Sequence, residues 1–125
     1  MDAKNFDKLD RIFEMQAVLD GYIREKRQLD FRTDEWIQKR SLAMLSEISE
    51  LLAEVNFKWW KNPKDIDVPA VKEELVDILH FLVGMCLDVG MTAEEMFSIY
   101  YDKNKENFDR QDGKSLKKGY ELKPQ

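Results

Sequence analysis

Residues 69–90, which read PAVKEELVDILHFLVGMCLDVG, decide the fold of this chain. The middle of the segment carries one formal charge, Asp77, and one other strongly polar side chain, His80. Pro69 suits the first turn of a helix, and Gly90 suits the position just after the last turn. A helix this apolar is expected to lie at the centre of the fold, where the charge of Asp77 needs a partner or a metal ion.

Helical periodicity also dominates the rest of the sequence, and no alternating run of β-branched residues competes with it. Thr33 is the expected N-cap of a second helix, and Thr92 with Glu95 forms the expected capping box of another. We therefore predict an all-α fold, a four-helix-type bundle. Its helices are expected at about residues 4–27, 33–57, 69–90 and 92–111.

The composition is that of a small globular protein. Of the 125 residues, 43% are hydrophobic and 36% are charged, which fits a single globular domain. We expect this domain to cover residues 1–111. Residues 112–125 form a lysine-rich tail whose composition is compatible with mobility. A net charge of −5 argues against a nucleic-acid binder. No run of about 18 apolar residues is present, so we expect no contact with a membrane. The single cysteine, Cys86, forms no internal disulfide, which suits the cytoplasm.

Two acid motifs lie on neighbouring predicted helices, Glu47-Ile48-Ser49-Glu50 and Glu74-Leu75-Val76-Asp77. Residues three apart share a helix face, so packing the two helices together would gather four carboxylates. Such a cluster resists ionisation unless a cation lies within it, and ligands that offer only oxygen select Mg²⁺, Mn²⁺ or Ca²⁺ over zinc. We therefore predict a metal site. The alternative is a solvated edge on each helix, formed on the later one by Glu73, Asp77, His80, Gly84 and Asp88.

Two further features fit a site for a planar ligand with phosphates. Gln16 lies between Ile12 and Leu19 in the apolar stripe of the first helix, where its amide either pairs with the edge of a base or is satisfied inside the core. The segment Phe57-Lys58-Trp59-Trp60-Lys61 closes the second helix. Its tryptophans either cap the core or form a stacking platform beside phosphates, with the lysines supplying charge.

The last predicted helix changes character along one face. After Tyr100 the apolar stripe continues as Lys103, Asn104 and Asn107, with Arg110 at its margin. Lysine and arginine give phosphates charge-assisted hydrogen bonds, and asparagine adds a neutral donor. This face predicts a polyphosphate contact, and the alternative is a solvated helix end.

At these residues the sequence resembles the dimeric, all-α dUTPases, which belong to the all-α NTP pyrophosphatase superfamily together with the MazG-like enzymes. The four acids alone would indicate only the superfamily. The FKWW segment, the His80-Phe81 pair and the run from Lys103 to Gln111 point to dUTP. The matching stretches are FEMQ at 13–16, EISELLAE at 47–54, FKWW at 57–60, EELVDILHFL at 73–82 and YDKNKENFDRQ at 101–111.

The resemblance implies hydrolysis of dUTP to dUMP and pyrophosphate with Mg²⁺, or with Mn²⁺ as a substitute, by residues 1–111 as the catalytic domain. It implies that the catalytic metal ligands are Glu47, Glu50, Glu74 and Asp77. It also implies a set of substrate-binding residues: Gln16, Lys58, Trp60, His80, Phe81, Lys103, Asn104, Asn107 and Arg110. The expected assembly is a homodimer, with a tetramer as the alternative, because an apolar central helix and 11% aromatic residues leave a slim monomer with excess apolar surface.

Two other functions stay open at the level of the sequence. The first is a MazG-like or dCTP-type pyrophosphatase with a different base specificity. The second is a non-catalytic helical module that binds a partner through Trp59 and Trp60, with the acids as a solvated edge. Magnesium would leave the melting temperature of such a module unchanged.

Overall fold

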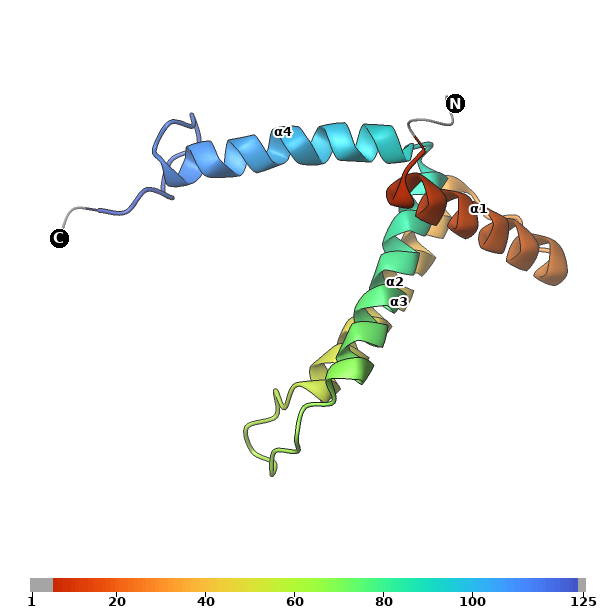
Figure 1. Cartoon of the computed structure of the whole chain (residues 1–125). Coiled ribbons are helices and arrows are strands. Elements are labelled where there is room, and N and C mark those ends of the chain that lie inside the picture. Colours follow the sequence, from red (N-terminus) through yellow and green to blue (C-terminus); the bar gives the residue numbers. More distant parts are fainter. Residues whose placement is uncertain (1–5, 124–125) are drawn as a thin grey trace. The chain divides into compact units, whose positions relative to one another are not determined.

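A computed structural model of the chain describes residues 6–123 (Figure 1). The helices are α1 (Lys8–Arg27), α2 (Thr33–Glu54), α3 (Val68–Asp88) and α4 (Ala93–Gln111). No strand occurs among the described residues, and the predicted all-α fold of four helices is confirmed. The chain divides into two compact units, one ending at Met91 and the other beginning at Thr92. Within residues 6–123, no single helix is both long enough and apolar enough to cross a membrane.

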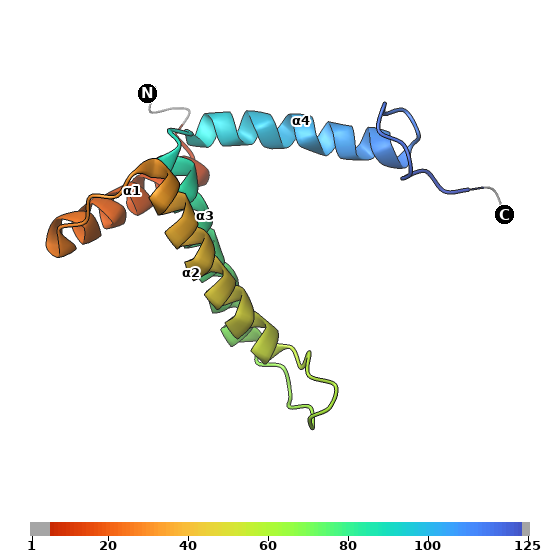
Figure 2. The same ribbon diagram turned by 180° about the vertical axis from the view of Figure 1, so that it is seen from behind.

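The first unit is built on a hairpin of α2 and α3, which run side by side in opposite directions (Figure 2). The Ser41 hydroxyl of α2 donates to the Met85 sulfur of α3 at 3.4 Å. Helix α3 also packs against α1, which is the central position predicted from its apolar sequence. Its Val83 has no exposed surface, and Phe13 of α1 and Cys86 of α3 are buried as well.

The boundaries of α1 and α2 correct the sequence-based expectation in three places. Helix α1 begins at Lys8, because Asp7 and Asp10 form a reciprocal capping box; the expected start near residue 4 lies outside the described residues. Thr33 is the first helical residue of α2 and not its N-cap, which is Arg32. Helix α2 ends at Glu54 and not near residue 57, since Asn56 takes a left-handed conformation with φ of 58°.

The boundaries of α3 and α4 agree more closely with the sequence. The Asp67 side chain accepts a hydrogen bond from the Ala70 amide at the start of α3, and Pro69 lies in the first turn as predicted. Gly90, with φ of 76°, follows the end of α3 in the conformation that favours glycine. The Thr92 hydroxyl accepts from the Glu95 amide at 3.1 Å, so Thr92 is the N-cap of α4 as predicted.

A buried ion network joins the three helices of the first unit. Arg40 of α2 donates from Nε to Asp88 Oδ2 of α3 at 2.5 Å, and Arg24 of α1 donates to Asp88 Oδ1 at 2.8 Å. Arg40 also lies 3.3 Å from Asp20 of α1. Gly84 leaves room for this arginine, because a Cβ there would lie 2.6 Å from Arg40 Nη1. The interpretation of the α3 stripe as a solvated edge is therefore wrong at Gly84 and Asp88, which face the network.

The second unit consists of α4 and the segment that follows it. Ser115 is buried, and its hydroxyl donates to Glu106 Oε1 at 2.5 Å and accepts from the Lys117 amide at 3.0 Å. The Arg110 guanidinium lies 5.4 Å from the centre of the Tyr120 ring. These contacts join residues 113–120 to the last turns of α4. The predicted domain boundary at residue 111 stays a prediction.

Candidate metal centre and substrate residues

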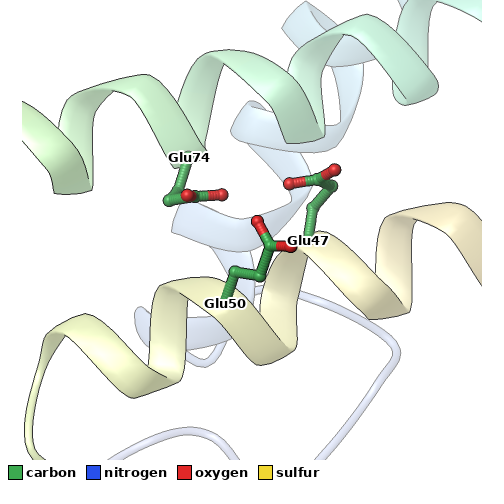
Figure 3. Close-up of side chains that lie close together, drawn as sticks. All are labelled: Glu47, Glu50 and Glu74. Atoms are coloured by element: carbon green, nitrogen blue, oxygen red, sulfur yellow. The ribbon is translucent and has the colours of Figure 1, made fainter.

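Three glutamates converge where α2 and α3 lie side by side (Figure 3). Glu47 and Glu50 lie one turn apart on α2, and Glu74 approaches them from α3. Each offers a carboxylate oxygen, and the three oxygens all lie within 4.8 Å of one another. The i, i+3 spacing places the first two on one helix face, and the antiparallel pairing brings Glu74 opposite them.

The cluster is partly withdrawn from water. Glu47 and Glu74 are half-buried, whereas Glu50 is exposed. Within the described residues, Oε2 of Glu47 and Oε2 of Glu74 are buried without a hydrogen-bond partner. Each of these oxygens has lost its hydration and gained no donor in exchange, which is unfavourable unless something else occupies the site.

The raised pKa values of the clustered carboxyl groups also favour a bound cation. Burial, with the neighbouring carboxyl groups of Glu47 and Glu50 adding to it, raises the pKa of Glu74 to about 7. Burial also raises the pKa of Glu47, and the charges of Glu50 and Asp77 act in the same direction. Acids that repel one another in this way ionise fully near neutral pH when a cation is held between them.

The residues present fit a hard divalent cation. They supply closely spaced oxygen ligands, two of which have no other partner, and neither thiolate nor imidazole belongs to the cluster. Asp77, the fourth predicted ligand, is exposed and is not among the three that converge. Its charge nevertheless contributes to the raised pKa of Glu47.

Gln16 is buried, and both ends of its amide are engaged inside the protein. Its Nε2 donates to Asp20 Oδ1 at 2.9 Å, and its Oε1 lies 2.6 Å from Nδ1 of His80 on α3. The structure therefore brings together two of the predicted base-binding residues, Gln16 and His80. The sequence left two possibilities for this amide, pairing with the edge of a base or being satisfied inside the core. In this structure it is satisfied inside the core.

Phe81 lies on a different side of α3 from His80, since successive residues of a helix are rotated by about 100°. It lines an open cavity of about 210 Å³ between α1, α2 and α3, together with Ile23 and Trp36. Arg40 borders the same cavity, and its guanidinium lies 4.7 Å from the centre of the Trp36 ring. The structure thus places His80 and Phe81 in two different surroundings.

Lys58 and Trp60 lie in the connection between α2 and α3, which extends beyond the end of the hairpin (Figure 1). Trp60 is exposed and packs edge-to-face against Trp59, with ring centres 4.6 Å apart. His80 lies about 18 Å along α3 from its first residue, at about 1.5 Å per residue. In this structure Trp60 is not beside His80, so the predicted base and sugar pocket is not assembled from both.

The remaining predicted contacts belong to α4 in the second unit. Lys103, Asn104 and Asn107 are exposed. Arg110 is half-buried, and its Nε donates to Glu106 Oε1 at 3.0 Å. The Ser115 hydroxyl and the Arg110 guanidinium lower the pKa of Glu106, so this pair is charged at neutral pH.

Sequence reasoning missed the polar partners of the site. Asp20 lies one turn after Gln16 on the same face of α1, and this spacing was a usable signal. Arg40 gave no signal, because an arginine in an amphipathic helix is usually exposed, whereas here it is 8% exposed.

Residues 8–92 match a protein family described as dUTPase, which covers more than half of the chain. The chain is 40% identical over 101 residues to the dCTP pyrophosphatase of Enterobacteria phage T4, covering 70% of this chain and 58% of the relative. It is 31% identical over 103 residues to the dCTP pyrophosphatase of Enterobacteria phage LZ5, covering 82% of this chain and 53% of the relative.

A third relative is a DNA replication protein of phage T4, which is 37% identical over 94 residues and is covered over 24% of its length. The chain spans about half the length of the two dCTP pyrophosphatases that it matches. No solved structure matches it.

Proposed function

Because this chain belongs to the all-α dUTPase family, we propose that it is a Mg²⁺-dependent nucleotide pyrophosphohydrolase. We infer dUTP as its preferred substrate, with dUMP and pyrophosphate as products. The observation that carries the proposal is the convergence of Glu47, Glu50 and Glu74, with two buried carboxylate oxygens that lack a partner. A solvated acidic edge would keep its oxygens in water and would not raise the pKa of Glu74.

The three converging glutamates would hold Mg²⁺, or Mn²⁺ in its place, and we assign Asp77 to the same set of ligands. The bound ion would polarise phosphoryl oxygens and lower the pKa of a coordinated water. Glu47 would orient that water or accept its proton, a role that suits a carboxyl group whose pKa is raised by burial. No serine or cysteine nucleophile is required, and Cys86 is a buried free thiol whose pKa is raised by burial.

The proposed nucleotide contacts are those predicted from the sequence. Lys103, Asn104, Asn107 and Arg110 would contact the phosphates and offset the negative charge that gathers in the transition state. Lys58 would add a further cation near the phosphates. His80, with Gln16 behind it, would contact the base or the sugar. Trp60 and Phe81 stay in the proposed set of substrate contacts. Because one copy of the chain does not bring them beside His80, we propose that a second copy completes the pocket, which would be too tight for the 5-methyl group of dTTP.

The second candidate substrate is dCTP. It is favoured by the relatives from phages T4 and LZ5, both of which are dCTP pyrophosphatases. The two substrates differ at N3 of the base, where uracil carries a hydrogen-bond donor and cytosine an acceptor. A closed site that leaves a polar group unpaired discriminates strongly against the wrong base.

We also propose that the protein acts as a homodimer in the cytoplasm. The first unit exposes large apolar side chains on α1 and α2, among them Val18, Tyr22, Leu42 and Leu45. A second copy of the chain is the partner that would cover such a surface symmetrically, and a tetramer is the alternative assembly.

Turnover of a panel of deoxynucleoside triphosphates tests the function. With Mg²⁺ we expect dUTP to give dUMP and pyrophosphate in equal amounts, and no turnover in the presence of a metal chelator. A preference for dCTP would replace the proposed substrate and keep the reaction. Absence of Mg²⁺-dependent turnover with every nucleotide, in a protein of normal helix content, would contradict the proposal.

A further inference from the structure

Four polar groups form a continuous chain through the first unit, from Arg40 on α2 through Asp20 and Gln16 on α1 to His80 on α3. We propose that Asp20, paired with Arg40, fixes the tautomer of His80 through Gln16, so that His80 presents Nε2 as an acceptor to a hydrogen-bond donor of the bound nucleotide. The contact with the nucleotide rests on the function proposed above. The control of the tautomer does not.

The first step is the pairing of Asp20 with Arg40. Arg40 Nη1 donates to Asp20 Oδ1 at 3.3 Å, and Arg40 Nη2 lies 3.3 Å from Asp20 Oδ2. Arg40 is itself fixed by Asp88, whose side chain is 1% exposed. An arginine side chain can only donate hydrogen bonds, and both carboxylate oxygens of Asp20 face it, so both act as acceptors. Asp20 can therefore only accept hydrogen bonds.

The second step orients the amide of Gln16. The side chain is 6% exposed, with Asp20 at one end of its amide and His80 at the other. Because Asp20 only accepts, the end of the amide that faces it must be the NH₂ group. The end that faces His80 is then the carbonyl oxygen. A flipped amide would set this oxygen against the Asp20 carboxylate.

The third step sets the proton of His80. The carbonyl oxygen of Gln16 lies 2.6 Å from Nδ1 and can only accept, so Nδ1 carries the hydrogen. A neutral imidazole has one N–H group, and the hydrogen bond at one nitrogen decides which tautomer is present. His80 Nε2 is therefore left with a free lone pair. Among the hydrogen bonds of the described residues, none involves this nitrogen, and the residue is exposed.

An acceptor at this position selects a donor on the ligand. In a deoxyuridine nucleotide the candidates are the N3–H group of the base and the 3′-hydroxyl of the sugar. Cytosine has an acceptor at N3, although its 4-amino group is a donor, so a contact with N3 would favour dUTP over dCTP. A contact with the 3′-hydroxyl of the sugar would give no preference between dUTP and dCTP. Asp20 and Arg40 are then positioning residues, because they act through Gln16 and His80.

The tautomer can be measured directly by ¹⁵N NMR of the imidazole of His80, which is the only histidine of the chain. At a pH at which the ring is neutral, we expect a protonated Nδ1 and an unprotonated Nε2 in the protein without nucleotide. A protonated Nε2 with a bare Nδ1 would overturn the proposal. This measurement needs no variant and no enzymatic activity.

Two variants test the relay itself. Gln16→Leu removes the acceptor of Nδ1, and Asp20→Ala frees the amide of Gln16 to rotate. In both we expect the ¹⁵N shifts to move toward the mixture of tautomers of a free imidazole. Glu14→Ala is the matched control, since Glu14 is exposed on the same helix and, among the described residues, pairs with Arg11 alone. A merely structural role of Asp20 would leave the tautomer of a folded Asp20→Ala protein unchanged, and that result would refute the relay.

The ligand contact is tested by nucleotide binding, with the melting temperature as a check of folding. We compare dUTP with its N3-methyl and its 3′-deoxy analogue, at a metal concentration that supports binding without turnover. The wild-type protein should bind one analogue about threefold to tenfold more weakly than dUTP, the range for one net hydrogen bond. Gln16→Leu should reduce that difference. Equal binding of all three nucleotides by the wild type would contradict the contact.

The two proposals fail in different ways. A protein that hydrolyses dUTP but carries its His80 proton on Nε2 would refute the relay and keep the function. A protein with the proton on Nδ1 that neither binds nor hydrolyses any nucleotide would refute the function and leave the relay standing.

Discussion

Glu74 is the carboxyl group whose ionisation is most changed by the fold. Its pKa is raised to about 7 from an ordinary value of 4.5, first by burial and then by Glu47 and Glu50. A raised pKa in the folded state means that protonation favours folding. The contribution of Glu74 to stability is therefore present below about pH 4.5 and is lost as the pH rises through about 7.

The pH dependence of the melting temperature tests this point. In the presence of a metal chelator, we expect the wild type to lose stability relative to Glu74→Gln between about pH 4.5 and pH 7.5. Millimolar Mg²⁺ at pH 8 should raise the melting temperature of the wild type and leave that of Glu74→Gln unchanged. The control is Glu73→Gln, which removes an exposed charge next to the cluster. If both variants followed the same pH curve, Glu74 would not be the group responsible.

Asp77 poses a separate question at the scale of the residue. It is exposed and stands outside the three converging oxygens, yet its charge reaches Glu47. If Asp77 is a metal ligand, Asp77→Asn should lower turnover by about 100-fold or more. Residues that only hydrogen-bond to a metal ligand typically cost roughly 10- to 100-fold when they are replaced. Circular dichroism should show unchanged helix content. Near-normal activity would remove Asp77 from the site.

At the scale of the element, the contact between α2 and α3 depends on one residue without a side chain. A Cβ on Gly84 would lie 2.6 Å from Arg40 Nη1 and 3.1 Å from its Cζ. The guanidinium is held by Asp88 and Asp20, and Arg40 as a whole is 8% exposed, so the group has little room to move. Helix α3 therefore needs glycine here for packing, although glycine lowers the stability of a helix interior by about 0.5–1 kcal/mol relative to alanine.

Two glycine-to-alanine changes are expected to affect stability in opposite directions. Gly84→Ala should destabilise the protein by about 1–3 kcal/mol, because the added methyl group displaces the buried arginine. Gly21→Ala, in the middle of α1 with nothing within 4 Å of the added carbon, should stabilise it by about 0.5–1 kcal/mol. Urea unfolding of both variants measures the difference. If the Gly84→Ala protein were as stable as the wild type, Arg40 and its ion pairs would be able to move aside for the methyl group at little cost in stability.

At the scale of the whole molecule, the open question is what covers the apolar side chains of the first unit. Leu42 and Leu45 lie one turn apart on α2 and are 61% and 60% exposed. If they lie in a dimer interface, Leu45→Lys should weaken dimerisation at least about tenfold, since burying one leucine stabilises by about 1.5–3 kcal/mol and 1.4 kcal/mol corresponds to tenfold. Ser46→Lys, an exposed polar neighbour, is the control. Sedimentation equilibrium measures both, and a wild type that stays monomeric at micromolar concentration would exclude the dimer.

The sequence alone was enough to predict the four helices and most of their ends. Apolar periodicity and caps such as Thr92 are local properties, so a single chain segment carries the whole signal. The boundaries were wrong where a competing contact decided them. Asn56 takes a left-handed conformation and its side chain binds the backbone of Lys64 at both the amide and the carbonyl group, which ends α2 early.

The candidate site was only partly readable from the sequence. The i, i+3 spacing placed Glu47 and Glu50 on one face of α2, and only the pairing of α2 with α3 brought Glu74 opposite them while leaving Asp77 exposed. Of the two partners of Gln16, Asp20 follows from its spacing on the same helix, but His80 on α3 could not be deduced. Two polar groups on different helices meet only when the crossing and the rotation of both helices are fixed, and those depend on the packing of the whole unit.

The sequence by itself thus determined the helical class and the family, and it predicts a hard divalent cation as the ligand of the acids. Tertiary structure alone decided which carboxylate oxygens lose their water and that Arg40 lies inside the unit. It also decided that the amide of Gln16 is held between Asp20 and His80. The physical reason is that helix formation depends on neighbours along the chain, whereas desolvation and the partners of a buried polar group depend on neighbours in space.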